Sequence, residues 1–382
     1  MSFEPLKGIR VVDVTASLAG PSCTQLLAAL GADVVKVEPR EGDHARAWGP
    51  PFVDGDGVLF FAANAGKRSL AVDLEEDIDV VLSLVDEADV FVQSLRPGLA
   101  ERRGLGADAL HARNPRLVYC TIGAYGATGP LADRPGYDPL MQAATGLMSV
   151  TGEADGPPVR AGVSLIDFAT GQWASIGILA ALLERETTGA GRTIDTSLYE
   201  TSLALLSSQL AAYAATGEAP GRHGSAFPLI APYEVFPTSD GALMIVAGSD
   251  GLYERLRGAL GLPDDERFRT NPDRVRNRAE LAALLTERLR TRTSAEWEAE
   301  LTDAGVPASP LRDVGEAFEH EQTRALGILQ RLGEGTTVSP PLSVDGERIR
   351  HRSPPPRLGD YEDEGHGSEG GHGSEGDHGP AR

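Results

Sequence analysis

The 382-residue sequence is poor in cysteine and in lysine, and each shortage narrows the classes of protein to consider. Two cysteines, Cys23 and Cys120, cannot build a disulfide framework or a metal site by themselves. Arginine carries nearly all of the positive charge, because lysine occurs only at positions 7, 36 and 67. The formal net charge is −21, and an acidic surface repels nucleic acid and anionic membranes. We therefore expect neither of these partners and a reducing, cytoplasmic location.

Long apolar runs are also missing. The most apolar stretch, residues 163–184, is interrupted by Gly171, Gln172 and Gly177 and falls short of the roughly 20 apolar residues that span a bilayer. The chain begins with a strand pattern that lacks the basic and apolar regions of a signal peptide. These features predict a globular protein that neither crosses nor binds a membrane.

Several cofactor motifs are absent from the sequence. The turn TASLAGPS (15–22) lacks the G-x-G-x-x-G that lets a backbone approach a pyrophosphate, which argues against nicotinamide binding. No G-x-S-x-G, H-E-x-x-H or Walker sequence occurs. The histidines at 44, 111, 223, 320 and 351 show no metal-ligand spacing. We expect no metal and no tightly bound cofactor, and we interpret these histidines as surface or loop residues.

Strand and helix patterns alternate in the first half of the chain. Buried-strand patterns at 9–14 and 32–38 flank a helical stretch at 22–31, which is a βαβ unit. The alternation continues through a strand-like GVSLID (162–167), and helices are predicted at 168–185 and about 195–216. This pattern predicts an α/β fold, with a parallel sheet flanked by helices.

The composition and the pattern of the chain change after residue 216, and we predict four segments. Residues 1–215 form the first part of a large domain, and 216–320 form a linker and a smaller α+β domain with helices at 250–262, 277–292 and 294–304. The turn TSDG (238–241) predicts a hairpin in this domain. Residues 321–356 return to the large domain. The acidic, His- and Gly-rich segment 357–382 is predicted to be disordered.

Basic residues gather in two predicted strand-end loops. NAGKRSL (64–70) contains Lys67 and Arg68, and LRPGLAERR (95–103) contains Arg96, Arg102 and Arg103. Arginine forks suit phosphate groups, and α/β sheets bind ligands at the carboxyl ends of their strands. A phosphorylated ligand and ordinary surface ion pairs both remain open for these residues.

Asp167 is a lone carboxylate at the start of the apolar stretch. Aspartate is a common helix N-cap, although Thr170 stands where a full capping box would have Glu or Gln. A catalytic carboxylate would occupy the same position, next to the N–H groups of a helix start that stabilise negative charge. The residues around Asp167 do not decide between these roles.

Eight segments in collinear order between residues 5 and 355 resemble the family III CoA-transferases, a group that also contains α-methylacyl-CoA racemases. They include GDHAR (42–46), NAGKRSLAVDL (64–74), LRPGLAERRGLG (95–106), RPGYDPLMQ (134–142) and GVSLIDFATG (162–171). The resemblance implies a Rossmann-like large domain, a small α+β domain and an interlocked homodimer. It also implies coenzyme A, delivered as an acyl-CoA, and a free carboxylic acid as the substrates.

The resemblance assigns roles to individual residues. Asp167 falls on the catalytic aspartate, which would attack the thioester to give an acyl-aspartyl anhydride and then an aspartyl-CoA thioester. The residues that would contact CoA are Asn64, Lys67, Arg68, Arg96, Arg102 and Tyr125. Leu18 stands where a glutamine is frequent in this family, and NAGKR replaces NRNKR, so some polar contacts to CoA or to the acyl group would differ.

Two alternatives to a transferase remain. The racemases of this group have a histidine directly before an aspartate, where this chain has Tyr137 before Asp138. The ordinary pKa of tyrosine is about 10, a poor match to a base that works near neutrality, so a transferase is favoured. A non-catalytic acyl-CoA-binding paralogue is the second alternative, and the presence of Asp167 argues against it.

A glycine-containing loop, GRHGSAFP (221–228), is predicted near the active site by the same resemblance. Arg222 and His223, next to Gly224, would pair with a second carboxylate, which suggests a small dicarboxylate such as succinate. A solvated loop is an equally good interpretation of these residues.

Overall fold

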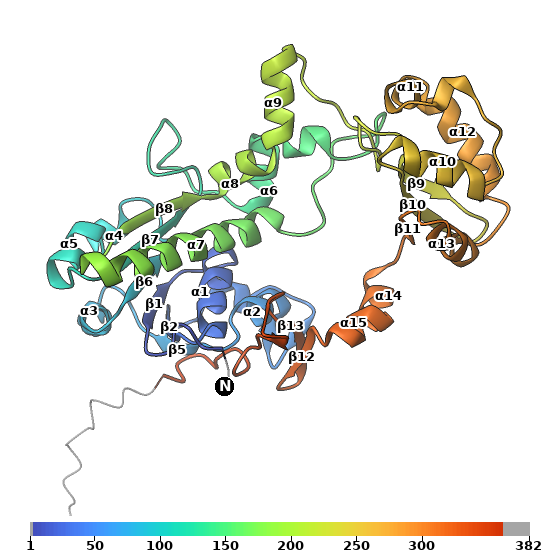
Figure 1. Cartoon of the computed structure of the whole chain (residues 1–382). Helices are drawn as coiled ribbons and strands as arrows, with labels where there is room; N and C mark the ends of the chain where they lie inside the picture. The colour runs from blue at the N-terminus through green and yellow to red at the C-terminus, as the bar shows by residue number, and fades with distance from the viewer. Residues whose placement is uncertain (1–2, 362–382) are drawn as a thin grey trace, which may run out of the picture.

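The computed structural model describes residues 3–361, and its largest part is a six-stranded sheet (Figure 1). The strand order is β5–β2–β1–β6–β7–β8, and every neighbouring pair is parallel. The strands are β1 (Arg10–Val14), β2 (Asp33–Glu38), β5 (Arg68–Ala71), β6 (Val90–Gln93), β7 (Val118–Gly123) and β8 (Thr193–Ser197). The order reverses between β1 and β6, as it does in doubly wound Rossmann-type sheets. The predicted α/β class with a parallel sheet is confirmed.

Helices cover both faces of this sheet because its strands alternate their apolar side chains. In β1, Val11 packs with α1 (Ala19–Ala29) and α7 (Leu165–Thr188) on one face. Val12 and Val14 point to the other face, where α3 (Ile78–Asp86) and α5 (Ala107–Arg113) lie. Successive strand residues face opposite sides, so one short apolar strand supplies both cores.

The two helices on the first face, α1 and α7, approach each other closely at Gly171. A Cβ added there would lie 2.6 Å from the carbonyl oxygen of Ala19 and 2.2 Å from the Oγ of Ser22. A residue larger than glycine would therefore push the helices apart. This contact fixes the first turns of α7 against the start of α1.

Helix α7 is long and apolar enough to cross a bilayer by length and composition, and no other helix within residues 3–361 is. Its residues Ile166, Ala174 and Ile178 are fully buried in the core beside the sheet. A core helix passes the same test of length and composition, so the apolar sequence of α7 is accounted for by this packing.

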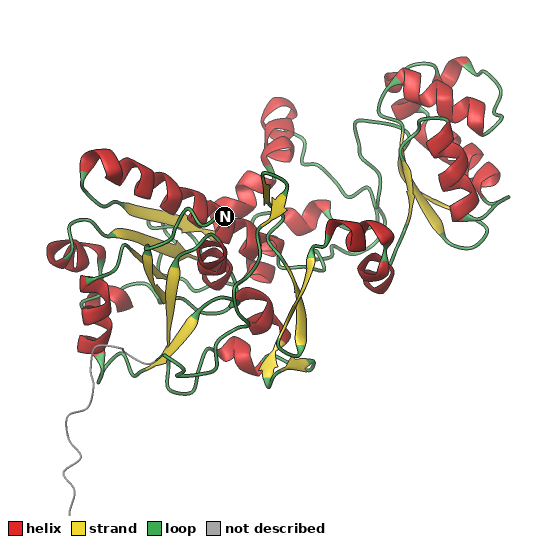
Figure 2. Ribbon diagram, turned by 60° about the horizontal axis from the view of Figure 1, so that its bottom comes forward, coloured by secondary structure: helices red, strands yellow, loops and turns green. Residues whose placement is uncertain are grey.

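A separate three-stranded antiparallel sheet, in the order β11–β10–β9, lies apart from the six-stranded body (Figures 1 and 2). Its core includes Leu243, Leu256 and Trp297. The predicted TSDG hairpin joins two of its strands. The strands of this sheet are β9 (Tyr233–Pro237), β10 (Ala242–Val246) and β11 (Ala308–Pro310). The helices of the same part are α10 (Asp250–Ala259), α11 (Asn271–Arg276), α12 (Arg278–Leu289) and α13 (Ser294–Asp303). The proposed domain boundaries themselves stay a prediction.

After β11 the chain returns to the six-stranded body. The hairpin of β12 (Leu329–Leu332) and β13 (Gly335–Val338) packs through Leu332 against Phe61 of α2 (Val58–Ala63). Contacts continue to the end of the described chain, where Asp360 accepts a hydrogen bond from the N–H of Ser69. Of the segment 357–382 that was predicted to be disordered, residues 359–361 are bonded to Ser69, which contradicts the prediction there. Residues 362–382 lie outside the described residues.

The remaining elements are short or connect these parts. They are η1 (His44–Ala47), β3 (Phe52–Val53), β4 (Asp56–Gly57), α4 (Leu99–Arg102), α6 (Asp138–Ala144), η2 (Leu147–Val150), α8 (Leu198–Leu205), α9 (Ser207–Thr216), η3 (Glu266–Phe268), α14 (Val314–Glu319), α15 (Glu321–Leu326), β14 (Ser343–Val344) and β15 (Glu347–Arg348).

Two local predictions are wrong. GVSLID is not a strand, because residues 162–164 form a bend and α7 begins at Leu165. The helix predicted from 195 begins at Leu198, since residues 193–197 pair with β7 as the last strand and Ser197 caps α8. His351 lies in a loop, as the prediction of surface or loop histidines allows, but it is buried there, at 5% exposed, and burial lowers its pKa.

Candidate active site

A cavity of about 730 Å³ opens at the carboxyl ends of β1, β6 and β7, where the strand order reverses. Its wall includes Ser17 after β1, Arg96 after β6, Ala124 after β7 and Asp167 from α7. Doubly wound sheets bind ligands at this place, and roughly 300–1,000 Å³ is the usual size of a small-molecule site. The cavity is therefore the candidate active site.

Asp167 is the third residue of α7, and it faces the cavity without a partner for its side chain. Within residues 3–361 its carboxylate has no hydrogen bond and no ion pair. Burial, and then the negative charge of Asp138, raise the pKa of Asp167 to about 7. A carboxylate with no partner and a raised pKa at a cavity wall is the type of group that active sites use.

The helix cap, which was one of the two roles considered for Asp167, is supplied by another residue. Asp138, which is 1% exposed, accepts hydrogen bonds from the main-chain N–H groups of Ile166 (2.8 Å) and Asp167 (3.2 Å). Its other oxygen accepts from Gln142 at 2.6 Å. The capping role of Asp167 is thus wrong, because the orphan donors at the start of α7 already have a carboxylate from α6. For the same reason, these two N–H groups are not free to stabilise a substrate charge.

The loop between β1 and α1 forms another part of the wall. Ser17 has a φ of +69°, its N–H donates to Oδ1 of Asp43 at 3.3 Å, and its Oγ lies 2.8 Å from Nε2 of His44. Both Ser17 and His44 line the cavity. Leu18, at the position where a glutamine is frequent in the resembling family, is 2% exposed and packs inward.

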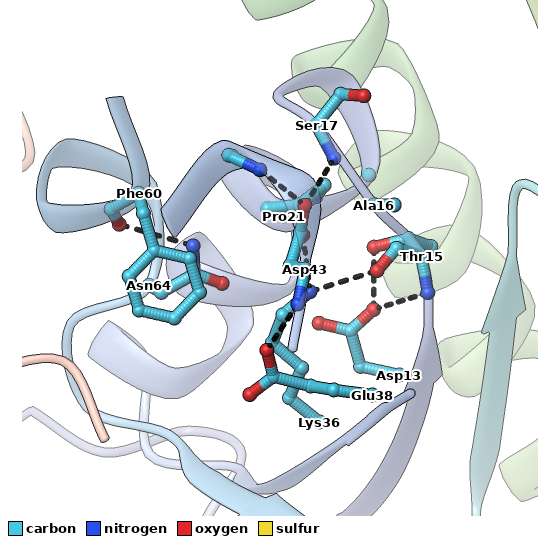
Figure 3. A network of polar contacts seen from close by, with 12 residues as sticks. Asp13, Thr15, Ala16, Ser17, Pro21, Lys36, Glu38, Asp43, Phe60 and Asn64 are labelled. Atoms are coloured by element: carbon cyan, nitrogen blue, oxygen red, sulfur yellow. Dashed lines mark hydrogen bonds and ion pairs between the residues drawn. The ribbon is translucent and has the colours of Figure 1, made fainter. Parts of the chain in front are cut away.

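A buried network of charges lies directly beneath this loop (Figure 3). Lys36 forms an ion pair with Asp43 at 3.0 Å and donates to the carbonyl oxygen of Thr15 at 2.7 Å. Lys67 forms an ion pair with Asp13 at 3.0 Å. Burial raises the pKa of Asp13, but Lys67 and Lys36 outweigh it and hold that pKa below its ordinary value. The network fixes the loop from below with fully buried charges.

The predicted CoA-contacting residues lie in different surroundings: some are at the cavity wall and others are buried behind it. Arg96 lines the cavity together with Asp167. The guanidinium of Arg102 lies against Gly98 of the cavity wall, where an added Cβ would be 2.9 Å from its Nη1. Lys67 and Asn64 are buried and bond to each other at 2.8 Å, so they support the cavity wall rather than line it.

The other predicted residues lie outside the lining of the cavity. Arg68 is ion-paired with Asp33 at 2.5 Å, and the ring of Tyr125 packs 5.7 Å from that of Tyr199. Arg222 donates to the carbonyl oxygen of Gly156 at 2.7 Å, and the N–H of Gly224 donates to the carbonyl oxygen of Gly152. The loop with Arg222, His223 and Gly224 is therefore tied to residues 152–156. Contacts of these residues with a substrate stay a prediction.

Sequence reasoning missed two features of the site. Asp138 caps α7, and no local pattern connects it with a helix that begins 27 positions later. The contact between Ser17 and His44 joins residues equally far apart. Within residues 3–361 no group of three His, Cys, Asp or Glu side chains is placed to hold a metal ion.

Strand order, cavity position and the lone carboxylate together define a doubly wound α/β protein with a ligand site at the reversal of its sheet. Comparison with known proteins identifies the family. The family model described as CoA-transferase family III matches residues 6–362. The chain belongs to this family, and it is a family III CoA-transferase.

Individual relatives are similar along nearly the whole chain. The succinate–glutarate CoA-transferase of Agrobacterium fabrum is 42% identical, and the alignment covers 94% of each chain. The acetyl-CoA:oxalate CoA-transferase of Acetobacter aceti is 39% identical, and the alignment covers 92% of each chain. A crystal structure of a CAIB/BAIF family protein from Brucella suis superposes with a TM-score of 0.86 at 40% identity, covering 94% of this chain and 97% of the other.

Proposed function

We propose that this protein transfers CoA from a dicarboxylic acyl-CoA to a second free dicarboxylate, with Asp167 as the nucleophile. The observation that carries the proposal is the unpartnered carboxylate of Asp167 in a cavity of suitable size at the reversal of the sheet. The names of its relatives, which specify glutarate, succinate and oxalate, support small dicarboxylates as the substrates.

The reaction proceeds by four acyl exchanges that return every group to its starting state. The Asp167 carboxylate attacks the thioester carbonyl, and CoA leaves as a thiolate, which gives an acyl-aspartyl anhydride. The thiolate attacks the aspartyl carbonyl and releases the donor acid, so that CoA is held as an aspartyl thioester. The acceptor carboxylate attacks this thioester and expels the thiolate again. The thiolate then attacks the acceptor acyl carbonyl, and Asp167 is regenerated as a carboxylate.

The electrostatics of the cavity suit both the nucleophile and CoA. With a pKa of about 7, Asp167 is largely ionised above neutral pH, and its lack of hydrogen bonds leaves its oxygens free to react. Arg96 in the wall and Arg102 behind Gly98 provide guanidinium groups for the phosphates. Lys67 and Asn64 bond to each other beneath the adjacent loop, and Tyr125 packs against Tyr199.

We propose in addition that two copies form an interlocked homodimer. Helices α7 and α9 expose large apolar side chains, with Trp173 53%, Ile176 55%, Leu183 75% and Tyr213 52% exposed. Exposed apolar surface of this kind marks interaction sites. Two long segments connect the three-stranded sheet with the six-stranded body (Figure 1). Light scattering should give twice the monomer mass, and Leu183→Glu should lower it.

The covalent intermediate is the test of the nucleophile. Incubation with succinyl-CoA, followed by hydroxylamine, should place a hydroxamate on Asp167, which peptide mass spectrometry detects. Asp167→Ala should show neither the hydroxamate nor transfer, while Asp155→Ala, an exposed loop residue, should show both. Equal labelling of the wild type and the Asp167 variant would overturn the mechanism.

The racemase alternative makes a different prediction in the same cavity. Tyr137, which stands in place of the racemase histidine, lines the cavity and is 57% exposed. α-Deuterium incorporation into a branched acyl-CoA in D₂O, with no transfer to any of a panel of acids, would reject the transferase and favour the racemase.

A further inference from the structure

Two polar side chains from distant loops meet at the wall of the cavity, and the proposed mechanism does not use them. The Oγ of Ser17, in the β1–α1 loop, lies 2.8 Å from Nε2 of His44, the first residue of η1. Both residues line the cavity that Asp167 faces. In the tautomer with hydrogen on Nε2, the ring donates to Ser17, and the hydroxyl hydrogen of Ser17 is left for another acceptor.

One buried carboxylate, Asp43, places the two residues side by side. Its Oδ1 accepts from the N–H of Ser17 at 3.3 Å and from the N–H of Ala45, at the start of η1, at 2.9 Å. Its Oδ2 is ion-paired with Lys36 at 3.0 Å, and both side chains are at most 1% exposed (Figure 3). Because the same carboxylate holds both loops, the contact between Ser17 and His44 is built into the buried network.

The backbone of Ser17 also points to a functional role. Its φ of +69° lies in the left-handed region, which residues other than glycine, asparagine and aspartate seldom adopt. Such a conformation is strained for serine and persists where the surrounding structure holds it, frequently at active sites. A glycine would adopt this φ without strain, whereas the serine places a hydroxyl at the cavity wall.

The position of the pair relative to Asp167 shows which end of a bound acyl-CoA it would meet. Ser17 precedes Ala19 by two residues, and the carbonyl oxygen of Ala19 lies against Gly171, one turn after Asp167 in α7. The pair and Asp167 thus line the same cavity, on loops and helices joined by the contact of α1 with the first turns of α7. The phosphates of CoA are separated from the thioester by the whole pantetheine arm.

We propose that Ser17, with its hydroxyl oriented by His44, binds the second carboxylate of the dicarboxylic substrate and so determines specificity for diacids over monoacids. The inference rests on the proposed transferase function. The carboxylate would accept a charge-assisted hydrogen bond from the Ser17 hydroxyl, while the N–H of His44 donates to the Oγ of Ser17 and leaves that hydroxyl hydrogen available. Lys36 and Asp43 are positioning residues, because they act through the two loops and do not face the substrate.

The test compares acids that differ only in the second carboxylate. Glutarate and pentanoate serve as acceptors for Ser17→Gly, which removes Oγ and suits the positive φ, and for His44→Phe, which keeps a ring beside Trp48. Each variant should lower kcat/KM for glutarate by about 10- to 100-fold, the loss of a hydrogen bond to a charged group, and change pentanoate transfer by less than about 3-fold. His44→Gln, which retains an N–H donor, should restore part of the glutarate activity.

His320→Asn is the matched control, since His320 caps α15 far from the cavity and asparagine is also a capping residue. This variant should leave kcat/KM unchanged for both glutarate and pentanoate. Equal losses for glutarate and pentanoate in the Ser17 and His44 variants, with unchanged melting curves, would overturn the proposal, because they would indicate general support of the loop or a contact with CoA.

A binding measurement separates this proposal from the proposed function. The thioether S-(4-carboxybutyl)-CoA carries the second carboxylate, S-pentyl-CoA does not, and neither can acylate Asp167. Calorimetry should show weaker binding of the first compound only, in both variants. If the wild type transfers CoA to no acid, the proposed transferase function is wrong. The difference in binding between the two thioethers still supports or rejects the carboxylate contact in that case.

Discussion

Replacing Asp167 by asparagine should abolish transfer and, at the same time, stabilise the folded protein above neutral pH. Burial and Asp138 raise the pKa of Asp167 from the ordinary 3.8 to about 7. Between these values the folded state holds a proton that the unfolded chain has released. The free energy of unfolding therefore falls as the pH rises from about 4 to 7. The gap between the two pKa values corresponds to about 4 kcal/mol at pH 8, an upper limit because the side chain is partly open to the cavity.

Asparagine has nearly the same shape and carries no charge, so the variant escapes this loss. Urea unfolding followed by circular dichroism at pH 5, 6, 7 and 8 measures the difference, with the transition of the six-stranded body analysed separately from that of the smaller sheet. The stability advantage of Asp167→Asn should grow from pH 5 to pH 8. Asp155→Asn, in an exposed loop, should show no such trend. An advantage that is constant with pH would refute the assignment of this titration to Asp167.

Three further substitutions test the surroundings of the site. Asp138→Asn keeps an oxygen for the cap of α7 but removes a charge, so the acidic limb of the kcat–pH profile should move to lower pH as the pKa of Asp167 falls. Lys36→Met leaves a buried carboxylate without its cation and should lower the urea-unfolding free energy by about 3–5 kcal/mol. Gly171→Ala should cost about 1–3 kcal/mol by the same measurement, because its Cβ meets backbone, whereas Gly177→Ala meets only a side chain and should cost less.

The sequence predicted those features that depend on local patterns. Apolar runs with strand and helix periods predicted the parallel sheet, and the cavity lies at the strand ends where such sheets bind ligands. The motifs around Asp167 and Arg96 predicted two residues that do line one cavity. In each case the residue lies in or next to an element whose pattern is visible in a short window.

Features that depend on contacts between distant segments were missed. A helix cap is usually sought within the helix start itself, but α7 receives its cap from Asp138, on a different helix. The family resemblance implied that Lys67 contacts CoA, and this contact stays a prediction; in the folded chain three buried acceptors, including Asp13, surround its ammonium group. Only the folded chain shows whether a charged side chain faces a ligand or a buried partner.

The net charge of −21 sets a physical problem for a protein whose substrates are anions. Long-range repulsion opposes the approach of CoA thioesters and dicarboxylates, so attraction must come from cations close to the cavity. Lys36 and Lys67 do not provide it, since both are buried in ion pairs. The guanidinium groups of Arg96 and Arg134 in the wall remain for this task. The lysines instead hold the β1–α1 loop in place, and this division separates positioning of the site from attraction of the substrate.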